Sequence, residues 1–209
     1  GEIAVDIDYA TYLGYASNTT TTTAWAMAQM AAVSATYVKE INCQLVISYM
    51  RVWTTQDPYT STSGNQMLNQ FRADWITTQS GVQRVVAHLL SRRQNLDVAG
   101  IAFLGVLCST QSGYGLSATL TGAAPNLPNY TYDVETTAHE IGHNFGSPHT
   151  HYCGWVGGPI DTCSDIEGGC YSGPLHGTVG TIMSYCDISA GGSVVMNFGP
   201  QPGELIRNS

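Results

Sequence analysis

Three histidines and a glutamate in residues 136–150, TTAHEIGHNFGSPHT, have the types and spacing of a metal site. His139 and His143 are four residues apart, so on a helix their imidazoles project from one face, within reach of one ion. Glu140 occupies the neighbouring position, from which its carboxylate can point into a cleft beside the metal and take a proton from metal-bound water. The chemistry that this pattern predicts is metal-assisted hydrolysis.

A third histidine follows the end of the predicted helix. Gly146 can adopt a positive φ and end the helix, and Pro148 cannot continue it, so the chain can turn and bring His149 to the same ion. Three neutral imidazoles leave one position of a tetrahedral zinc open for water, which is the arrangement of a catalytic zinc. The motif HExxH also occurs by chance in unrelated helices, so the prediction depends on the added glycine and third histidine.

A second motif, TIMSY at residues 181–185, follows the histidines. HExxHxxGxxH with a later methionine turn is the signature of the metzincins. On these residues the chain resembles the metzincin zinc endopeptidases, and most of all their adamalysin (reprolysin) branch. A lone methionine is usually core filling. The resemblance implies that Met183 packs beneath the metal without binding it, so Met183 and Gly146 are expected to have structural roles.

The chain departs from the adamalysin pattern at two positions. Thr150 follows the third histidine, where adamalysins usually carry aspartate, so that family's support for the methionine turn is missing or replaced. Tyr185 resembles the tyrosine of astacins and serralysins, which can approach the zinc and stabilise the transition state. The resemblance therefore implies a divergent secreted zinc endopeptidase, with Glu140 as general base and Tyr185 as a second catalytic residue.

The hydrophobic periodicity predicts the scaffold that positions these residues. Strand-like and helix-like segments alternate up to Gly146, whereas the following segment is rich in Gly, Pro and Cys and has little periodicity. This pattern indicates a largely parallel sheet with helical crossovers. With the family resemblance, it implies an α+β, zincin-like fold: a mixed, mostly parallel twisted sheet with an antiparallel edge strand, an active-site helix and a small irregular disulfide-linked C-terminal subdomain. Residues 1–209 would form a single catalytic domain, with an upper subdomain at 1–149 and a lower one at 150–209.

The individual elements are predicted from the same patterns. The expected strands are at 3–9, 43–54, 82–90, 100–108 and 114–120, and the expected helices are at 24–41, around 67–75 and around 203–207. The threonine run 19–23 is interpreted as the entry to the first of these helices. Residues 113–120 are expected to be the exposed edge to which a peptide substrate adds as a further strand, with main-chain contacts from Gly113, Tyr114, Gly115 and Leu116.

Some acidic residues suggest a second metal site. Glu2, Asp97 and a C-terminal asparagine such as Asn208 are arranged along the chain rather like the calcium ligands of adamalysins. The cofactors implied are thus Zn²⁺ in the cleft and, as a candidate, a structural Ca²⁺ away from it. Acidic residues near chain ends are more often simply solvated, and this alternative stays open.

Six cysteines without a CxxC pair favour disulfides and an oxidising compartment, hence secretion. The preferred pairs are Cys163–Cys170 around a Gly-rich loop, Cys153–Cys186 bracing two sides of the site, and Cys43–Cys108 joining two strands, although other connectivities stay open. The start GEIAVDIDY does not resemble a signal peptide. We therefore expect a mature fragment from which a targeting segment and a pro-segment have been removed.

Composition excludes several classes of partner. Lys and Arg number 7 against 15 Asp and Glu, a formal net charge of −8, so nucleic acid and anionic membranes are not expected partners. No apolar run reaches the length that membrane insertion requires. The expected partners are protein or peptide substrates, and the expected state is a monomer. Asn18 and Asn129 begin glycosylation sequons, which matter only if the source glycosylates proteins.

The remaining histidines, His88, His151 and His176, are predicted to be structural or surface residues, although His151 and His176 could line a substrate pocket. Two other functions stay open. The chain could be a non-catalytic binding module that keeps the fold, although the intact glutamate and histidines count against this. It could also hydrolyse a non-protein amide, because HExxH serves in such enzymes too.

Overall fold

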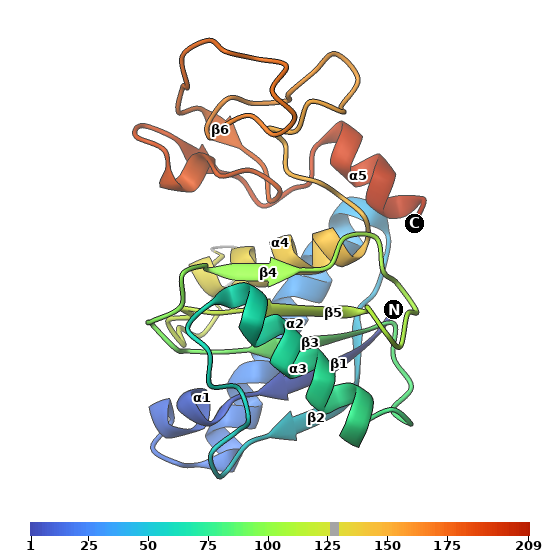
Figure 1. The fold of residues 1–209 in the computed structure, drawn as a ribbon, viewed down its shortest axis with the longest axis vertical. Coiled ribbons are helices and arrows are strands. Elements are labelled where there is room, and N and C mark those ends of the chain that lie inside the picture. The colour runs from blue at the N-terminus through green and yellow to red at the C-terminus, as the bar shows by residue number, and fades with distance from the viewer. Residues whose placement is uncertain (126–129) are drawn as a thin grey trace.

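A five-stranded sheet with helices on both faces forms most of residues 1–149, here called the N-terminal region (Figure 1). The computed structural model describes residues 1–125 and 130–209, so Asn129 of the second sequon lies outside the described residues. The strand order is β2-β1-β3-β5-β4, in which β4 runs antiparallel at one edge and the other strands are parallel. This confirms the predicted fold class. The strands are β1 Glu2–Ile7, β2 Val46–Val52, β3 Val86–Leu90, β4 Gly100–Ala102 and β5 Tyr114–Ser117.

Helices cover both faces of this sheet because its strands are apolar on both sides. Along β1, Ile3 and Val5 pack in one hydrophobic cluster with the helices α2 and α4, whereas Ala4 packs in a second cluster with α3. The helix bounds are α1 Tyr9–Gly14, α2 Thr19–Ile41, α3 Gly64–Thr78 and α4 Tyr132–Asn144. The threonine run lies inside α2 rather than before it, because Asn18 caps the helix by accepting a hydrogen bond from the Thr21 amide.

Strand β5, which was predicted to be the substrate-binding edge, lies inside the sheet. It pairs with β3 on one side and with β4 on the other, and its four residues are buried. The prediction that Gly113, Tyr114, Gly115 and Leu116 bind a peptide strand was therefore wrong, because their ladder positions are already occupied. The edge of the sheet on this side is β4. It is shorter than predicted, because the chain leaves the sheet and the Gly105 and Val106 amides bond to the last carbonyls of α4.

Residues 150–209, here called the C-terminal region, are mostly irregular and lie beyond α4 in Figure 1. Their regular elements are short: β6 Val179–Gly180, β7 Ser193–Val194, the 3₁₀ helix η1 Cys186–Ile188 and α5 Pro200–Arg207. Two disulfides cross-link the region, Cys153–Cys170 and Cys163–Cys186. None of the described helices is both long enough and apolar enough to cross a membrane.

The disulfide pairing differs from the predicted one at every position. Cys163–Cys170 and Cys153–Cys186 exchange partners, because Cys163 is buried against Cys186, at a Cα–Cα distance of 5.0 Å. Cys43 and Cys108 are free instead of paired. Cys43 precedes the edge strand β2, whereas the Cys108 amide bonds to Val85 beside β3, so β1 separates them.

The predicted calcium ligands lie at opposite ends of the sheet. Glu2 begins β1, whereas Asp97 precedes β4, whose Gly100 is in register, through β5 and β3, with Ile7 at the end of β1. The Asp97 carboxylate instead accepts a hydrogen bond from the Gly64 amide at the start of α3. The structure therefore does not assemble the calcium site suggested by Glu2 and Asp97.

Candidate metal centre

Helix α4 holds the first two histidines at fixed positions. Thr131 caps it, and Val134, Ala138 and Ile141 anchor one face in the core, so the opposite face presents His139 and His143. The helix ends before Gly146, which has a φ of 102°, as the sequence predicted. The turn that follows brings His149 back towards α4.

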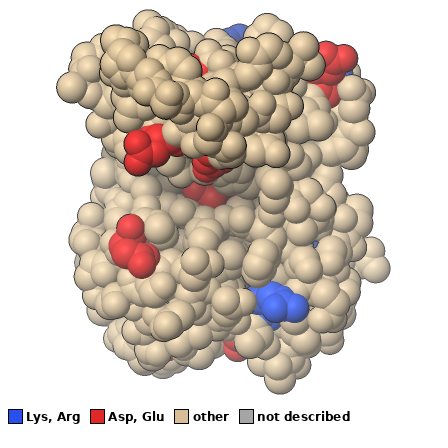
Figure 2. All heavy atoms as spheres, turned by 45° about the horizontal axis from the view of Figure 1, so that its top comes forward, with Lys and Arg blue, Asp and Glu red and all other residues tan. Residues whose placement is uncertain are grey.

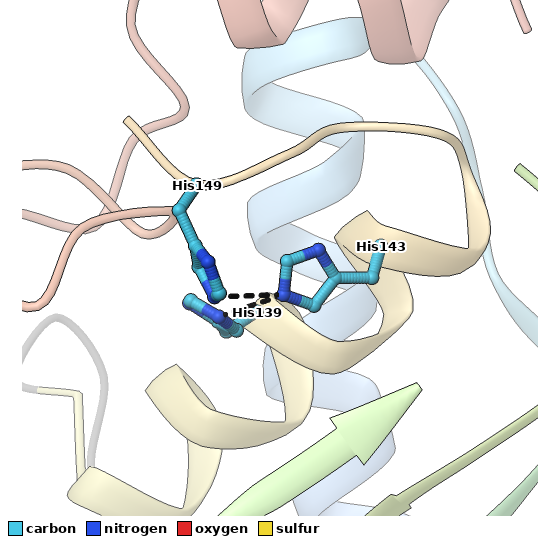
Figure 3. Close-up of side chains that lie close together, drawn as sticks. All are labelled: His139, His143 and His149. Carbon is cyan, nitrogen blue, oxygen red and sulfur yellow. Dashed lines mark hydrogen bonds between the residues drawn. The ribbon is translucent and has the colours of Figure 1, made fainter. Parts of the chain in front are cut away.

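The three histidine rings converge (Figure 3). Nε2 of His143 lies 3.1 Å from Nε2 of His139 and 3.1 Å from Nε2 of His149. These three residues form a group whose possible ligand atoms all lie within 4.8 Å of one another. The structure thus brings together the three residues that the sequence selected.

The hydrogen bonds of the other ring nitrogens show what this centre can hold. Nδ1 of His139 lies 2.6 Å from the Ile182 carbonyl oxygen, and Nδ1 of His143 lies 2.7 Å from that of Ser147. Nδ1 of His149 lies 2.7 Å from Oε1 of Glu167. All three partners are acceptors, so each Nδ1 carries the proton and each Nε2 presents a lone pair to the centre. Three converging lone pairs fit a divalent metal ion.

Burial keeps the ligands in the protonation state that metal binding requires. It lowers the pKa of His139 and of His143, and it lowers the pKa of His149 to about 3. All three imidazoles are therefore neutral near pH 7. Burial also raises the pKa of the Glu140 carboxyl well above its usual range. Glu140 Oε2 is buried without a hydrogen-bond partner among the described residues, so it is available to a ligand in the cleft.

Two glycines that the sequence analysis did not select as site residues leave room for the side chains of Glu140 and Met183. A Cβ at Gly100 on β4 would lie 2.4 Å from Oε1 of Glu140, so only glycine lets the edge strand pass this carboxylate. A Cβ at Gly142 on α4 would lie 2.6 Å from Sδ of Met183. Gly142 lies within the motif HEIGH, so its role could have been predicted from the sequence. The role of Gly100 could not, because it depends on the strand order.

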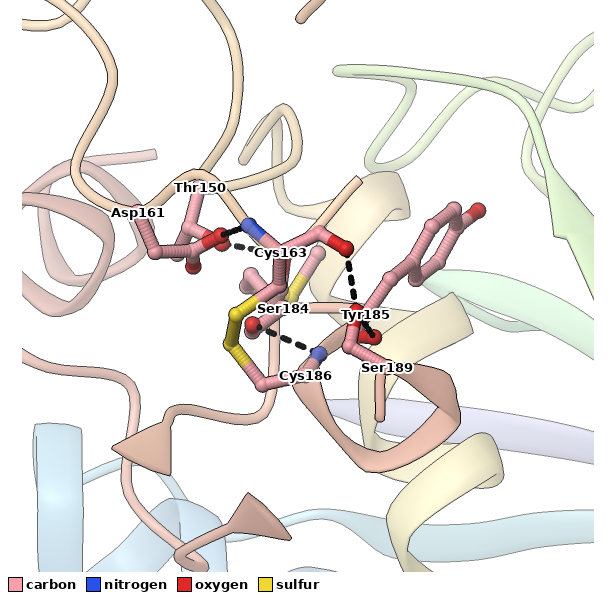
Figure 4. Close-up of a disulfide and its surroundings, with 8 residues drawn as sticks. Thr150, Asp161, Cys163, Ser184, Tyr185, Cys186 and Ser189 are labelled. Carbon is pink, nitrogen blue, oxygen red and sulfur yellow. Dashed lines mark hydrogen bonds between the residues drawn. A yellow bond between two sulfur atoms is a disulfide. The ribbon is translucent and has the colours of Figure 1, made fainter. Parts of the chain in front are cut away.

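The methionine turn packs under the helix, and Thr150 supports it. Met183 is fully buried. The Thr150 amide donates to the Met183 carbonyl oxygen at 2.9 Å, and the Thr150 hydroxyl donates to the same oxygen at 3.2 Å. The support that adamalysins usually obtain from aspartate is thus replaced by threonine. The Cys163–Cys186 disulfide lies close to this turn (Figure 4).

Tyr185 lies beside the histidines. Its ring centroid is 5.7 Å from that of His139 and 4.5 Å from that of His149. Burial, followed by the charges of Glu140, Glu167 and Asp187, raises the pKa of the Tyr185 phenol to about 12. The phenol therefore keeps its proton near neutral pH and can donate a hydrogen bond.

Glu167 contacts the metal centre, and the sequence analysis did not select it. It lies on an irregular loop and bonds to His149, with Oε1 also 3.6 Å from Nε2 of the buried His151. The His151 ring stacks on that of His149 at 4.8 Å. No local pattern marks a carboxylate 18 residues away as the partner of His149. His88, predicted to be structural, is fully buried and lies 2.9 Å from the Ser117 hydroxyl.

The site combines a helix that carries two histidines and a glutamate with a third histidine after a glycine turn and a methionine beneath them. This combination is typical of metal-dependent hydrolases. Comparison with known families agrees. Residues 2–197 match Metallo-peptidase family M12, and the chain belongs to this family. The family is one of metallopeptidases, and it implies zinc as the metal.

Two solved structures resemble the chain. One, described as "Structure of a chaperone-substrate complex", has a TM-score of 0.52 and 12% identity, with 99% of this chain covered. The other, metalloproteinase-II from Bacteroides fragilis, has a TM-score of 0.47 and 17% identity, with 71% of this chain covered. The chain spans 33% of the first protein's length and 42% of the second's. At these identities the first likeness shows a shared fold alone.

Proposed function

We propose that residues 1–209 form the catalytic domain of a secreted zinc endopeptidase of the metzincin type, with adamalysin features and an astacin-like tyrosine. His139, His143 and His149 would hold the zinc. The observation that carries the proposal is the convergence of three neutral imidazoles, each with its outer nitrogen bonded to an acceptor. When bound, zinc supplies a water of lowered pKa and polarises the scissile carbonyl.

The residues around the metal centre would perform the proton transfers. A zinc ion beside Glu140 would favour the ionised carboxylate and offset the effect of burial on its pKa. Glu140 is then the general base: its unpartnered Oε2 accepts a proton from the attacking water and later donates it to the leaving amine. The protonated Tyr185 phenol stabilises the developing oxyanion by donating a hydrogen bond. Met183 and Gly146 act structurally, by packing under the site and by turning the chain towards His149.

We place the substrate along β4 in place of the buried strand β5. One side of β4 bonds to β5, and the other side borders a cavity of about 360 Å³ that reaches the metal centre. An extended peptide can add to this edge as a further strand, with its scissile bond beside Glu140 and His143. The open edge and the cavity support a polypeptide substrate over a small amide.

The two disulfides support an oxidising, extracellular compartment. The monomeric state and the removed pro-segment stay predictions.

The test combines metal content with peptide cleavage. The purified chain should bind one zinc and cleave casein or a quenched peptide, lose activity with a zinc chelator and regain it with zinc. Glu140→Gln should keep the zinc and lose about 10³-fold in kcat/KM. Glu204→Gln, at an exposed glutamate of α5, is the matched control and should retain activity. A zinc-loaded chain that cleaves no peptide, or an active Glu140→Gln variant, would contradict the proposal.

A further inference from the structure

A second cavity, of about 320 Å³, adjoins the metal centre on the side of His139. It shares Val98, Gly100, Glu140 and Tyr185 with the cavity along β4, so the two cavities adjoin. Its walls come from the start of α4, the chain before β4 and the segment that ends in η1. A substrate side chain next to the scissile bond can therefore enter it.

The lining of this second cavity is acidic. Glu135, Asp187 and Asp97 line it together with Glu140, and no Lys or Arg of the described residues does so. Among the described residues, neither Glu135 nor Asp187 forms an ion pair. Burial, followed by the charge of Asp187, raises the pKa of Glu135 to about 7, so a cation in the cavity would favour the ionised form of this carboxyl. Figure 2 shows acidic side chains in and beside the hollow between the two regions.

The cavity combines a buried carboxylate with apolar walls, so it differs from a surface cluster of acids. Glu140 is only 5% exposed, and its Oε2 has no hydrogen-bond partner among the described residues. Val98 and Ile188 supply apolar wall beside the carboxylates. Apolar wall with a negative lining suits a long side chain that has an aliphatic stem and a cationic head.

A metal ion fits this cavity less well. Within the described residues, the groups whose ligand atoms lie within 4.8 Å of one another do not include Glu135, Asp187 or Asp97. These carboxylates are too dispersed to hold one ion. They can instead surround the head of an extended organic cation.

The position of the cavity along β4 decides which substrate residue enters it. Antiparallel pairing is the more stable arrangement for an added strand. A peptide antiparallel to β4 runs from Ala102 towards Gly100, and Val98 and Gly100 line the second cavity. The residue that enters it is therefore on the C-terminal side of the scissile bond.

On the basis of the proposed function, we propose that this cavity binds a lysine or arginine side chain immediately after the scissile bond. The enzyme would then cleave on the N-terminal side of basic residues. Glu135, in the first turn of α4, and Asp187, in η1, would be its specificity-determining residues. The carboxylates would attract the basic side chain of the residue that becomes the amino terminus of the second product.

The test compares two quenched peptides that differ only at the residue after the cleaved bond, lysine against the uncharged norleucine. The zinc-loaded chain should prefer lysine by at least about tenfold in kcat/KM. The double variant Glu135→Gln with Asp187→Asn should lower this ratio about tenfold, and each single variant should lower it by less. Glu204→Gln changes the net charge by the same amount as one single variant, far from the cleft, and should leave the ratio unchanged. An unchanged ratio in the double variant would overturn the proposal.

Two further measurements separate this proposal from the proposed function. A digest of a peptide library, analysed by mass spectrometry, should show lysine and arginine enriched directly after the cleaved bonds; cleavage without that enrichment overturns the specificity alone. Calorimetry with the zinc-loaded Glu140→Gln chain should show tighter binding of the lysine peptide than of the norleucine peptide. Preferential binding by Glu140→Gln, together with an unsubstituted zinc-loaded chain that cleaves nothing, would support the cavity and contradict the peptidase function, whereas equal binding would overturn the cavity proposal.

Discussion

The N-terminal and C-terminal regions build the two sides of the metal centre by different means. In the N-terminal region, a paired sheet and long helices fix the backbone, and the one helix α4 carries His139, Glu140 and His143. In the C-terminal region, two disulfides and scattered hydrogen bonds hold irregular chain. That region contributes the acceptors Ile182 and Glu167 and the ring of Tyr185.

This difference shows that one region sets the spacing of the site residues and the other sets their orientation. Residues on α4 are placed relative to one another by the helix itself, which needs no distant partner for that spacing. Their orientation depends on the C-terminal region, because the outer nitrogens of His139 and His149 bond to Ile182 and Glu167. Substitutions in the N-terminal region should therefore affect the positions of the reacting groups. Substitutions in the C-terminal region should affect the stability of the fold and its affinity for the metal.

The largest effect in this comparison should come from the cysteines. Removing Cys163–Cys186 with alanine at both positions opens a cross-link of sequence separation 23, which should lower the free energy of unfolding by about 3 kcal/mol. Thermal unfolding measures this loss. The matched control replaces the free Cys43 and Cys108 of the N-terminal region and should change stability much less. An equal loss of unfolding free energy in both variants would mean that the C-terminal region does not depend on its disulfide more than the N-terminal region depends on its free cysteines.

Gly100 tests the precision of the N-terminal region. In Gly100→Ala, the new Cβ would meet the Glu140 carboxylate at 2.4 Å, so the carboxylate or β4 must move. We expect kcat/KM to fall about 10²-fold while zinc content stays at one. Gly81→Ala is the control, because a Cβ there meets nothing within 4 Å. Normal activity in Gly100→Ala would show that the position of this carboxylate is not critical.

Glu167 tests the support from the C-terminal region. Glu167→Gln keeps the shape of the side chain but weakens the acceptor for Nδ1 of His149, so zinc affinity should fall about tenfold. Competition with a chelator measures this affinity. Asp165→Asn, at an exposed acid on the same loop, should leave the affinity nearly unchanged. If both variants bind zinc alike, Glu167 does not support the ligand.

The smallest effect is expected at Thr150. Thr150→Val removes the hydroxyl bond to Met183 but keeps the amide bond, which should cost about 1 kcal/mol in the free energy of unfolding. Thr150→Ser keeps both bonds and should lie closer to the unsubstituted chain. Denaturant unfolding compares the two. A loss in Thr150→Ser without a loss in Thr150→Val would assign the effect to the methyl group and not to the hydrogen bond.

The sequence by itself determined the elements with strong local patterns. The strand β1, the helix α4 and the turn at Gly146 follow from hydrophobic period, capping and glycine chemistry, all of which act over a few residues. His139, Glu140, His143 and His149 belong to this group, because a helix and one tight turn suffice to select them. The antiparallel edge of a mostly parallel sheet was also expected correctly.

Only the tertiary structure decided which distant segments meet. Strand order made β4 the edge and buried β5, it separated Glu2 from Asp97, and chain packing paired Cys163 with Cys186. Glu167 reached His149 in the same way. The physical reason is that such contacts depend on the summed packing of the whole chain, and residues close in space carry no shared local signal when they are far apart in sequence.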